Sequence, residues 1–189
     1  MVADYGFRFK KDELFRSIPG GYQDIGLGFV DRDPEFKISL VVAIRLDAVE
    51  EIANKFNSPF VKSVPRTDTF TCTLERFMPR ENTHFVVCTE ADIKNVVERL
   101  RPVIERRIIP FLNKTQDIRS VAAAMELPSI PKHGPGHNSA LVVARLIGHP
   151  KFESMCETYQ HRISKYPGVL RKELDNLIQY LRGLKPVVE

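Results

Sequence analysis

The sequence predicts an α+β fold, in which an antiparallel β-meander sheet of about five strands is packed by helices and followed by a C-terminal helical bundle. Two observations support this prediction. Apolar residues recur with a period of two from Gly6 to Glu90, and with the period of a helix after Thr89. The 189 residues are also 43% hydrophobic, which is sufficient to build a core without disulfides.

Three alternating runs open the chain, and short turns separate them. The first run ends at Pro19-Gly20-Gly21, and the second ends at Asp31-Arg32-Asp33-Pro34. Turns of this length join antiparallel neighbours, so the three runs are expected to form a meander. The third run, residues 36–46, is apolar on one face and mixed on the other, which is typical of a central strand. Two shorter runs, residues 69–77 and 84–89, complete the predicted sheet.

Helices are predicted after the third run and throughout the second half of the chain. The segment from Asp47 to Glu50 has the pattern of a capping box, and Thr89-Glu-Ala-Asp92 repeats that pattern. Pro102 lies inside the second of these helices. Because proline removes a backbone donor and clashes with the preceding turn, we expect a kink there or two abutting helices. Further helices are expected over residues 115–126 and 139–147, and in the segments that follow Pro150 and Gly168.

The predicted domain organisation has three parts. Residues 1–127 form the α+β domain, residues 128–137 form a Pro/Gly linker, and residues 138–189 form a C-terminal helical subdomain packed on or beside it. The linker assignment depends on three prolines and two glycines, which are incompatible with a helix or a strand.

Composition excludes several classes of protein. No apolar run approaches the roughly 18 residues of a membrane span, and the N-terminus lacks the layout of a signal peptide. The three cysteines, Cys72, Cys88 and Cys156, are widely spaced and odd in number, which excludes a disulfide scaffold or a zinc ribbon. We therefore expect a cytoplasmic protein with reduced thiols and no membrane partner.

Charge is distributed as a gradient along the chain. Residues 1–89 contain 12 Lys and Arg against 13 Asp and Glu, whereas residues 90–189 contain 16 against 11, so the net charge of +4 comes from the helical half. A nucleic-acid-binding protein usually shows a concentrated basic stripe rather than a small surplus. A protein partner is therefore favoured over a nucleic acid.

Four arginines on one predicted helix are the candidate binding residues: Arg99, Arg101, Arg106 and Arg107. One interpretation is a solvated face, since Glu98 and Glu105 lie among them and can form pairs along the helix. The other is a patch that binds a phosphate or an acidic protein. No aromatic residue is interleaved with these arginines, so stacking on single-stranded bases has no support.

His133-Gly-Pro-Gly-His137 is the candidate metal motif. Two imidazoles at this spacing could bind zinc or nickel, yet no further His or Cys follows before His149 and Cys156. Flanking Pro and Gly residues are typical of a solvated linker, so we expect no cofactor. No catalytic residue is predicted either. His84 and Cys88 lie about 13 Å apart along a strand that rises about 3.3 Å per residue, which is beyond hydrogen-bond reach.

Several segments resemble a known group of proteins. GFRFKKDELFRSI, GGYQDIGLGF, KISLVVAIRL and TEADIKNVVERLRPVIERRIIPFL look like uncharacterised bacterial domains catalogued as a domain of unknown function. Those domains are similar in layout to small immunity or adaptor proteins of toxin systems. The resemblance covers residues 6–115 and implies no activity or active-site residues. Such domains usually have a helix before the first strand, whereas only five residues precede Gly6 here.

We therefore predict a non-enzymatic, cytoplasmic, protein-binding domain of the immunity or adaptor kind. Two alternatives stay open. One is a metal-dependent enzyme that uses the His133/His137 loop, and the other is a weak nucleic-acid binder that uses the basic helical half. The sequence leaves the oligomeric state undecided.

Overall fold

The computed structural model describes residues 2–10, 13–32, 35–56, 67–79, 81, 83–127, 137–166 and 168–187. Strands come first and helices follow, which confirms the predicted α+β class. The elements are η1 (Val2–Tyr5), β1 (Arg8–Lys10), β2 (Glu13–Ile18), β3 (Gly21–Arg32), β4 (Glu35–Leu46), α1 (Asp47–Ala53), β5 (Phe70–Thr73), η2 (Leu74–Arg76), β6 (Phe85–Val87), α3 (Glu90–Val103), η3 (Ile104–Ile108), α4 (Ile109–Lys114), α5 (Ile118–Ala124), α6 (His137–Leu146), α7 (Phe152–Ile163) and α8 (Gly168–Gly183). No helix within these ranges is both long and apolar enough to cross a membrane.

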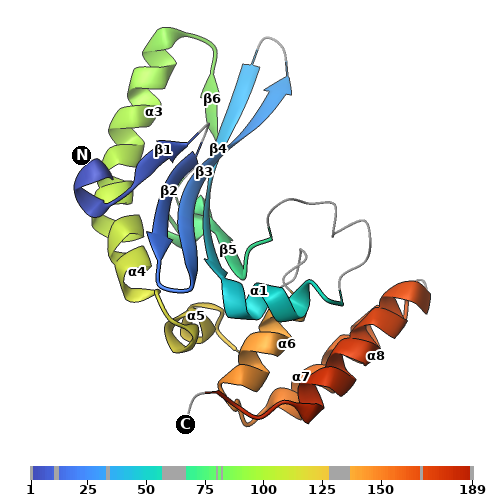
Figure 1. The fold of residues 1–189 in the computed structure, drawn as a ribbon. Helices are drawn as coiled ribbons and strands as arrows, with labels where there is room; N and C mark the ends of the chain where they lie inside the picture. The colour runs from blue at the N-terminus through green and yellow to red at the C-terminus, as the bar shows by residue number, and fades with distance from the viewer. Residues whose placement is uncertain are drawn as a thin grey trace. The chain divides into compact units, whose positions relative to one another are not determined.

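The sheet is an antiparallel meander in which β1 to β5 are neighbours in chain order (Figure 1). The turn from β2 to β3 pairs Ile18 with Gly21, and Gly20 adopts a φ of +70° there, a conformation that costs glycine least. β6 also pairs with β4, with Phe36 opposite Val87. The predicted run 69–77 is a strand only as far as Thr73, because η2 turns the chain immediately afterwards.

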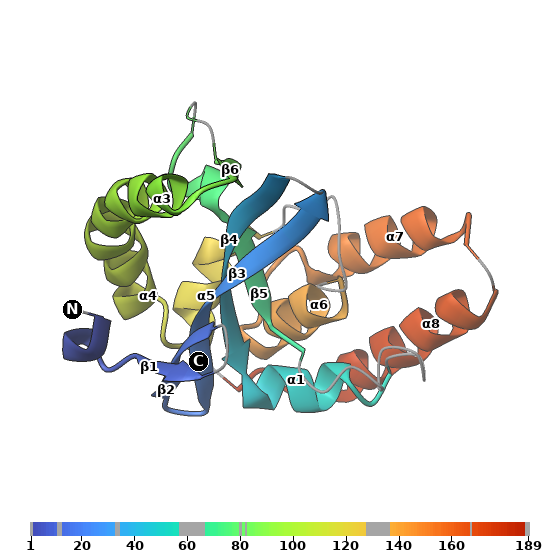
Figure 2. The same ribbon diagram turned by 90° about the horizontal axis from the view of Figure 1, so that it is seen from above.

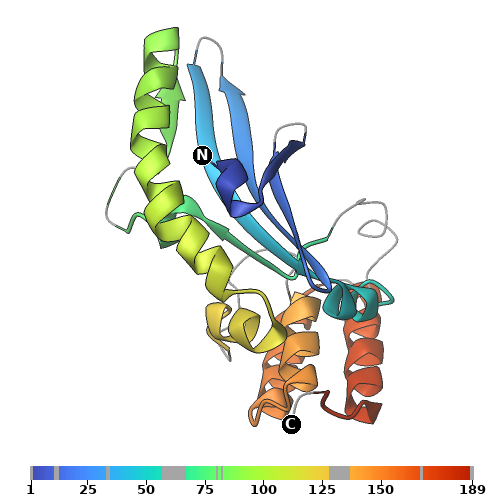
Figure 3. The same ribbon diagram turned by 60° about the vertical axis from the view of Figure 1, so that its left-hand side comes forward.

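α3, η3 and α4 follow one another without a break along the chain, as Figure 3 shows. Thr89 and Asp92 form the predicted capping box at the start of α3. An interruption of the helix was predicted at Pro102. Pro102 lies inside α3, and the irregular turn is instead the π-helical η3, which begins two residues later. In α geometry the ring of Pro110 would clash with the carbonyl of Arg106, four residues earlier. Arg106 belongs to the π turn, which comes directly before α4. A π turn is wider than an α turn, so it gives the proline ring more room.

The described chain divides into two compact units. Unit 1 contains residues 1–44 and 71–116, and unit 2 contains residues 45–70 and 117–189. In unit 1, apolar residues from the strands and from the α3–η3–α4 helices are buried. Its buried core includes Ile25, Leu40, Val42, Ile44, Leu74, Phe85, Val96, Leu100, Val103, Ile108, Ile109 and Leu112.

A buried glutamine anchors the end of α4 within unit 1. Gln23 is completely buried, and its Nε2 donates to the carbonyl oxygens of Leu112 at 2.8 Å and Thr115 at 2.7 Å. These carbonyls lie at the C-terminal end of α4, where helix carbonyl groups run out of backbone donors; that of Leu112 also accepts from the backbone N–H of Thr115 at 3.2 Å. The Oε1 atom of Gln23 accepts from Arg16 Nε at 3.1 Å and from Arg16 Nη2 at 2.5 Å. Partial burial lowers the pKa of Arg16. The network therefore ties the long helical segment to β2 and β3.

Unit 2 is built around α6. Residues 140–144 of α6 are completely buried, as expected for a helix that neighbours surround on every side. The C-terminal helices α6, α7 and α8 pack against one another, and α1 and α5 also contact α6. The predicted linker, residues 128–137, lies outside the described residues except for His137, which is the first residue of α6.

The capping box predicted at the start of α1 is wrong. Leu46 occupies the N-cap position, and no side chain caps the helix. Asp47 instead accepts a hydrogen bond from Arg45 Nε at 2.7 Å. Glu50, the residue expected at N3, is buried and accepts hydrogen bonds from two hydroxyl groups of unit 2. Glu50 thus binds hydroxyl groups that lie far away in the sequence instead of the N-cap backbone of its own helix.

Candidate binding site

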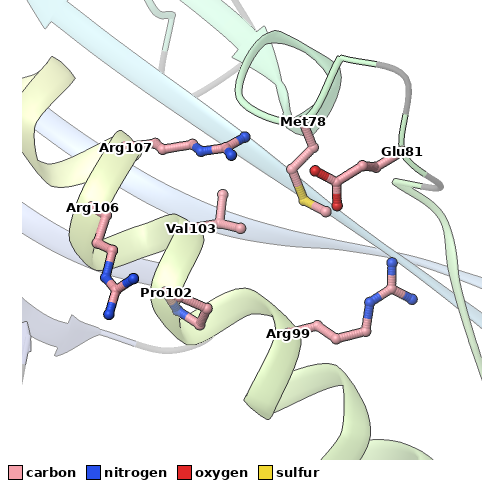
Figure 4. A pocket seen from close by; sticks show the side chains of 7 residues that line it. All are labelled: Met78, Glu81, Arg99, Pro102, Val103, Arg106 and Arg107. Carbon is pink, nitrogen blue, oxygen red and sulfur yellow. The ribbon is translucent and has the colours of Figure 1, made fainter.

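A pocket of about 260 Å³ lies in unit 1, between the α3–η3 segment and the chain that follows η2 (Figure 4). It is called the arginine pocket below. Seven side chains line it: Met78, Glu81, Arg99, Pro102, Val103, Arg106 and Arg107.

Helical spacing brings the three arginines of the pocket together. Arg99, Arg106 and Arg107 are separated by seven and eight residues, close to two helical turns, so they lie on one side of the helix. Pro102 and Val103 occupy the intervening turn and form the apolar floor between the arginine side chains. Because the helix begins at a capping box and ends at the Gln23 network, both of its termini are fixed.

Two of the arginines also contact residues outside the pocket lining. The guanidinium of Arg99 lies 4.9 Å from the centre of the Phe85 ring, within the range of a cation–π interaction. Arg107 donates from Nη1 to the carbonyl oxygen of Phe77. Figure 4 shows both guanidinium groups directed toward the wall that carries Met78 and Glu81. A guanidinium carries five N–H donors, more than the one bond of Arg107 to Phe77 uses.

The chemistry of the pocket favours an anion. Three arginines and one acid, Glu81, are among the lining residues, and arginine binds carboxylate and phosphate groups through two parallel hydrogen bonds. Met78 is almost completely buried and supplies an apolar surface beside these charges. A side chain that combines a short apolar stem with an anionic end would therefore match the lining.

Three of the four arginines predicted from the sequence meet in the pocket, and Arg101 does not line it. At about 100° of rotation per residue, Arg101 lies well over 120° around the helix from Arg99 and Arg106. The spacing of these residues along the helix could therefore have distinguished Arg101 from the three arginines of the pocket. Met78 and Glu81 were missed, because they come from a loop more than fifteen residues away along the chain.

The predicted histidine pair cannot be placed. His133 lies outside the described residues, and of His137 only the backbone is described, at the start of α6. Within the described part of the chain, no group of three or more His, Cys, Asp and Glu side chains could hold a metal ion.

The thiols differ in exposure. Cys156 is buried and burial raises the pKa of its thiol to about 11, which is typical of an unreactive core thiol. Cys72 is only partly exposed, and burial raises the pKa of its thiol to about 12. Cys88 is exposed at the start of α3. His84 Nε2 lies 3.8 Å from a carboxylate oxygen of Glu75.

A buried glutamate, Glu50, lies in unit 2 with two hydroxyl partners and was not predicted as a site. One carboxylate oxygen of Glu50 accepts from Ser139 Oγ at 2.8 Å and from Thr69 Oγ1 at 3.1 Å. The three residues are at most 4% exposed, and Thr69 Oγ1 also accepts from the backbone N–H of Leu46. These bonds connect α1, α6 and the approach to β5, which is the pattern of a structural polar network.

No family model matches this chain, and no curated protein or solved structure matches it either. The resemblance of residues 6–115 to bacterial immunity-like domains therefore stays a prediction.

Proposed function

We propose that this protein is a non-enzymatic, cytoplasmic, protein-binding domain of the immunity or adaptor kind, whose arginine pocket receives an acidic side chain of its partner. The observation that supports this proposal is that Arg99, Arg106 and Arg107 all line one small pocket. A charge-assisted hydrogen bond to a carboxylate contributes about 1.5–3 kcal/mol, so a few such bonds can select an acidic residue on a partner surface.

The pocket favours an acidic protein over a nucleic acid for two reasons. It is a local cavity rather than a groove that follows a phosphate backbone. No exposed aromatic side chain is among its lining residues, so it offers no platform for stacked bases.

The test uses a fluorescein-labelled hexaglutamate peptide and the full-length chain, with binding followed by fluorescence anisotropy. We expect Arg99→Ala and Arg106→Ala each to weaken binding about tenfold, which corresponds to the loss of one charged hydrogen bond. Glu81→Gln should tighten binding, because it removes the carboxylate that faces the arginines. A hexaglutamine peptide should not bind.

Arg101→Ala is the matched control. It changes the net charge by the same amount and lies on the same helix, but outside the pocket. If Arg101→Ala weakens binding as much as Arg106→Ala does, the peptide senses only the overall charge and the proposal is wrong. Tighter binding of an oligothymidylate than of hexaglutamate, with the same loss on Arg99→Ala, would assign the pocket to nucleic acid instead.

A further inference from the structure

Unit 1 also exposes a group of large apolar side chains that the arginine pocket does not use. They are called the apolar face and consist of Phe9, Leu27, Phe29, Phe36, Ile93 and Val97. Phe9 is 74% exposed, Phe29 56% and Phe36 46%, and the two residues of α3 are each about half exposed. Large exposed apolar side chains gathered on one surface mark interaction sites in otherwise polar surfaces.

The strand residues of the apolar face lie on one face of the sheet. Phe9 is opposite Leu14, and Leu14 is opposite Ile25, so side chains at these positions share a face. Strand alternation then places Leu27 and Phe29 on that face as well.

The same face continues onto β4. A Cβ at Gly28 would lie 2.8 Å from Ser39 Oγ, so Gly28 and Ser39 share the opposite face. Phe29 is one residue from Gly28 on β3 and Phe36 is three residues from Ser39 on β4, so both point to the face that carries Leu27. Ile38, on the Phe36 face, is paired with Phe85, whose ring lies beneath the guanidinium of Arg99.

α3 covers part of this face beside β6, as Figure 2 shows. Val96, Leu100 and Val103 are the buried residues of α3. At about 100° per residue, Arg99 and Arg106 lie on one side of that buried line, and Ile93 and Val97 lie on the other. The apolar face and the arginine pocket thus occupy opposite sides of the same helix.

We propose that the apolar face is the interface of a twofold-symmetric homodimer, so that its occupant is a second copy of this chain. The exposed area supports this occupant. The six side chains leave on the order of 500 Å² of apolar surface exposed, taking about 200 Å² for a whole aromatic side chain. Two copies would bury roughly 1,000 Å², which is the apolar share of a standard interface of about 1,600 Å².

The charges at the edge of the apolar face also fit a second copy. Glu90, Lys94 and Arg101 lie on the outer side of Ile93 and Val97 along α3, so the edge carries both signs. A symmetric interface must complement itself, which a mixed edge permits and an edge of one sign would prevent. If two α3 helices pack antiparallel with Ile93 on Val97 of the second copy, Glu90 lies within about one residue of its Arg101. A partner of one charge sign would meet like charges on this edge.

The first test measures the mass of the full-length chain by light scattering over a wide range of concentration. We expect twice the monomer mass at high concentration, and the monomer mass for Phe29→Asp and Val97→Glu. Val169→Glu is the matched control, because Val169 is 64% exposed in unit 2 and should leave the dimer intact. Circular dichroism verifies that the variants are folded. A wild-type chain that stays monomeric overturns the proposal, and so does a control that dissociates like the two variants.

The second test examines the antiparallel arrangement through charge. Arg101→Glu should raise the dimer dissociation constant roughly tenfold, because two symmetric pairs become repulsive. Adding Glu90→Arg in the same chain exchanges the two charges and should restore most of the affinity. A double variant that dimerises no better than Arg101→Glu contradicts the arrangement. This proposal does not rest on the arginine pocket, and Arg99→Ala should dimerise like the wild-type chain.

Discussion

Replacing Gln23 with leucine would test whether the glutamine network holds the helix that carries the arginine pocket. Leucine is similar in size and keeps the site filled, but it provides no donor for the carbonyl groups of Leu112 and Thr115. Arg16 would also lose the acceptor for its Nε and Nη2 groups. The substitution therefore removes hydrogen bonds from a completely buried position and leaves the shape of the core nearly unchanged.

The expected loss follows from the number of polar groups left without partners. An unsatisfied buried donor or acceptor costs about 1–3 kcal/mol. The carbonyl of Thr115 loses its donor and the guanidinium of Arg16 loses its Gln23 acceptor, whereas the carbonyl of Leu112 keeps the backbone N–H of Thr115. With two polar groups affected, we expect Gln23→Leu to cost about 3 kcal/mol. For a chain of this length, that loss lowers the melting temperature by about 6–12 °C. Gln23→Glu keeps the acceptors for Arg16 and removes only the donors, so it should also destabilise the protein.

Urea denaturation followed by circular dichroism measures the change in the free energy of unfolding. Gln160→Leu is the matched control, since Gln160 donates to Asp175 at 2.6 Å in an exposed pair, and its replacement should cost less than about 1 kcal/mol. The reasoning would be refuted if Gln23→Leu cost no more than this control.

Two further predictions concern unit 2. Ser139→Ala removes one of the two hydroxyl donors to the buried carboxylate of Glu50, and should lower the free energy of unfolding by about 2 kcal/mol in urea denaturation, whereas the same change at the exposed Ser154 should have little effect. Equal losses for both serines would contradict the role of the buried Glu50. Hydrogen bonds from Ser120 lower the pKa of Asp117, so Asp117 stabilises the folded state above its unfolded pKa of about 3.9, and this contribution is lost as the pH falls through the lower folded value. Asp117→Asn still caps α5 but does not titrate, so its urea midpoint should fall less than that of the wild-type chain between pH 5 and strong acid; parallel curves would disprove this assignment.

Local patterns in the sequence were sufficient to predict much of the fold. The alternation of apolar residues depends only on the pleat of a strand, so it located β3, β4 and the turns before each of them without knowledge of any partner. It did not show that the first run divides into β1 and β2, which pair with each other. The capping box at Thr89 was predicted correctly because all of its hydrogen bonds lie within four residues. The same reasoning failed at Asp47, where Arg45 and the distant Ser139 provide the actual partners of the two acids.

The candidate site was only half visible in the sequence. Arginines on one helix can be counted from the residues alone, and the prediction grouped four of them, of which three line the pocket. Met78 and Glu81, which close the arginine pocket, come from a loop whose position depends on how β5, β6 and α3 pack in unit 1. No pattern within the loop itself indicates that position.

The sequence by itself thus determined the class of fold, the order of strands and helices, and the basic side of one helix, because these depend on hydrogen bonds and periodicities between near neighbours in the chain. The tertiary structure alone decided that Glu50 is buried, that Gln23 completes the end of α4, and that large aromatic side chains of the sheet stay exposed beside α3. Burial and partnership are properties of packed surfaces, and residues far apart in the sequence supply those surfaces.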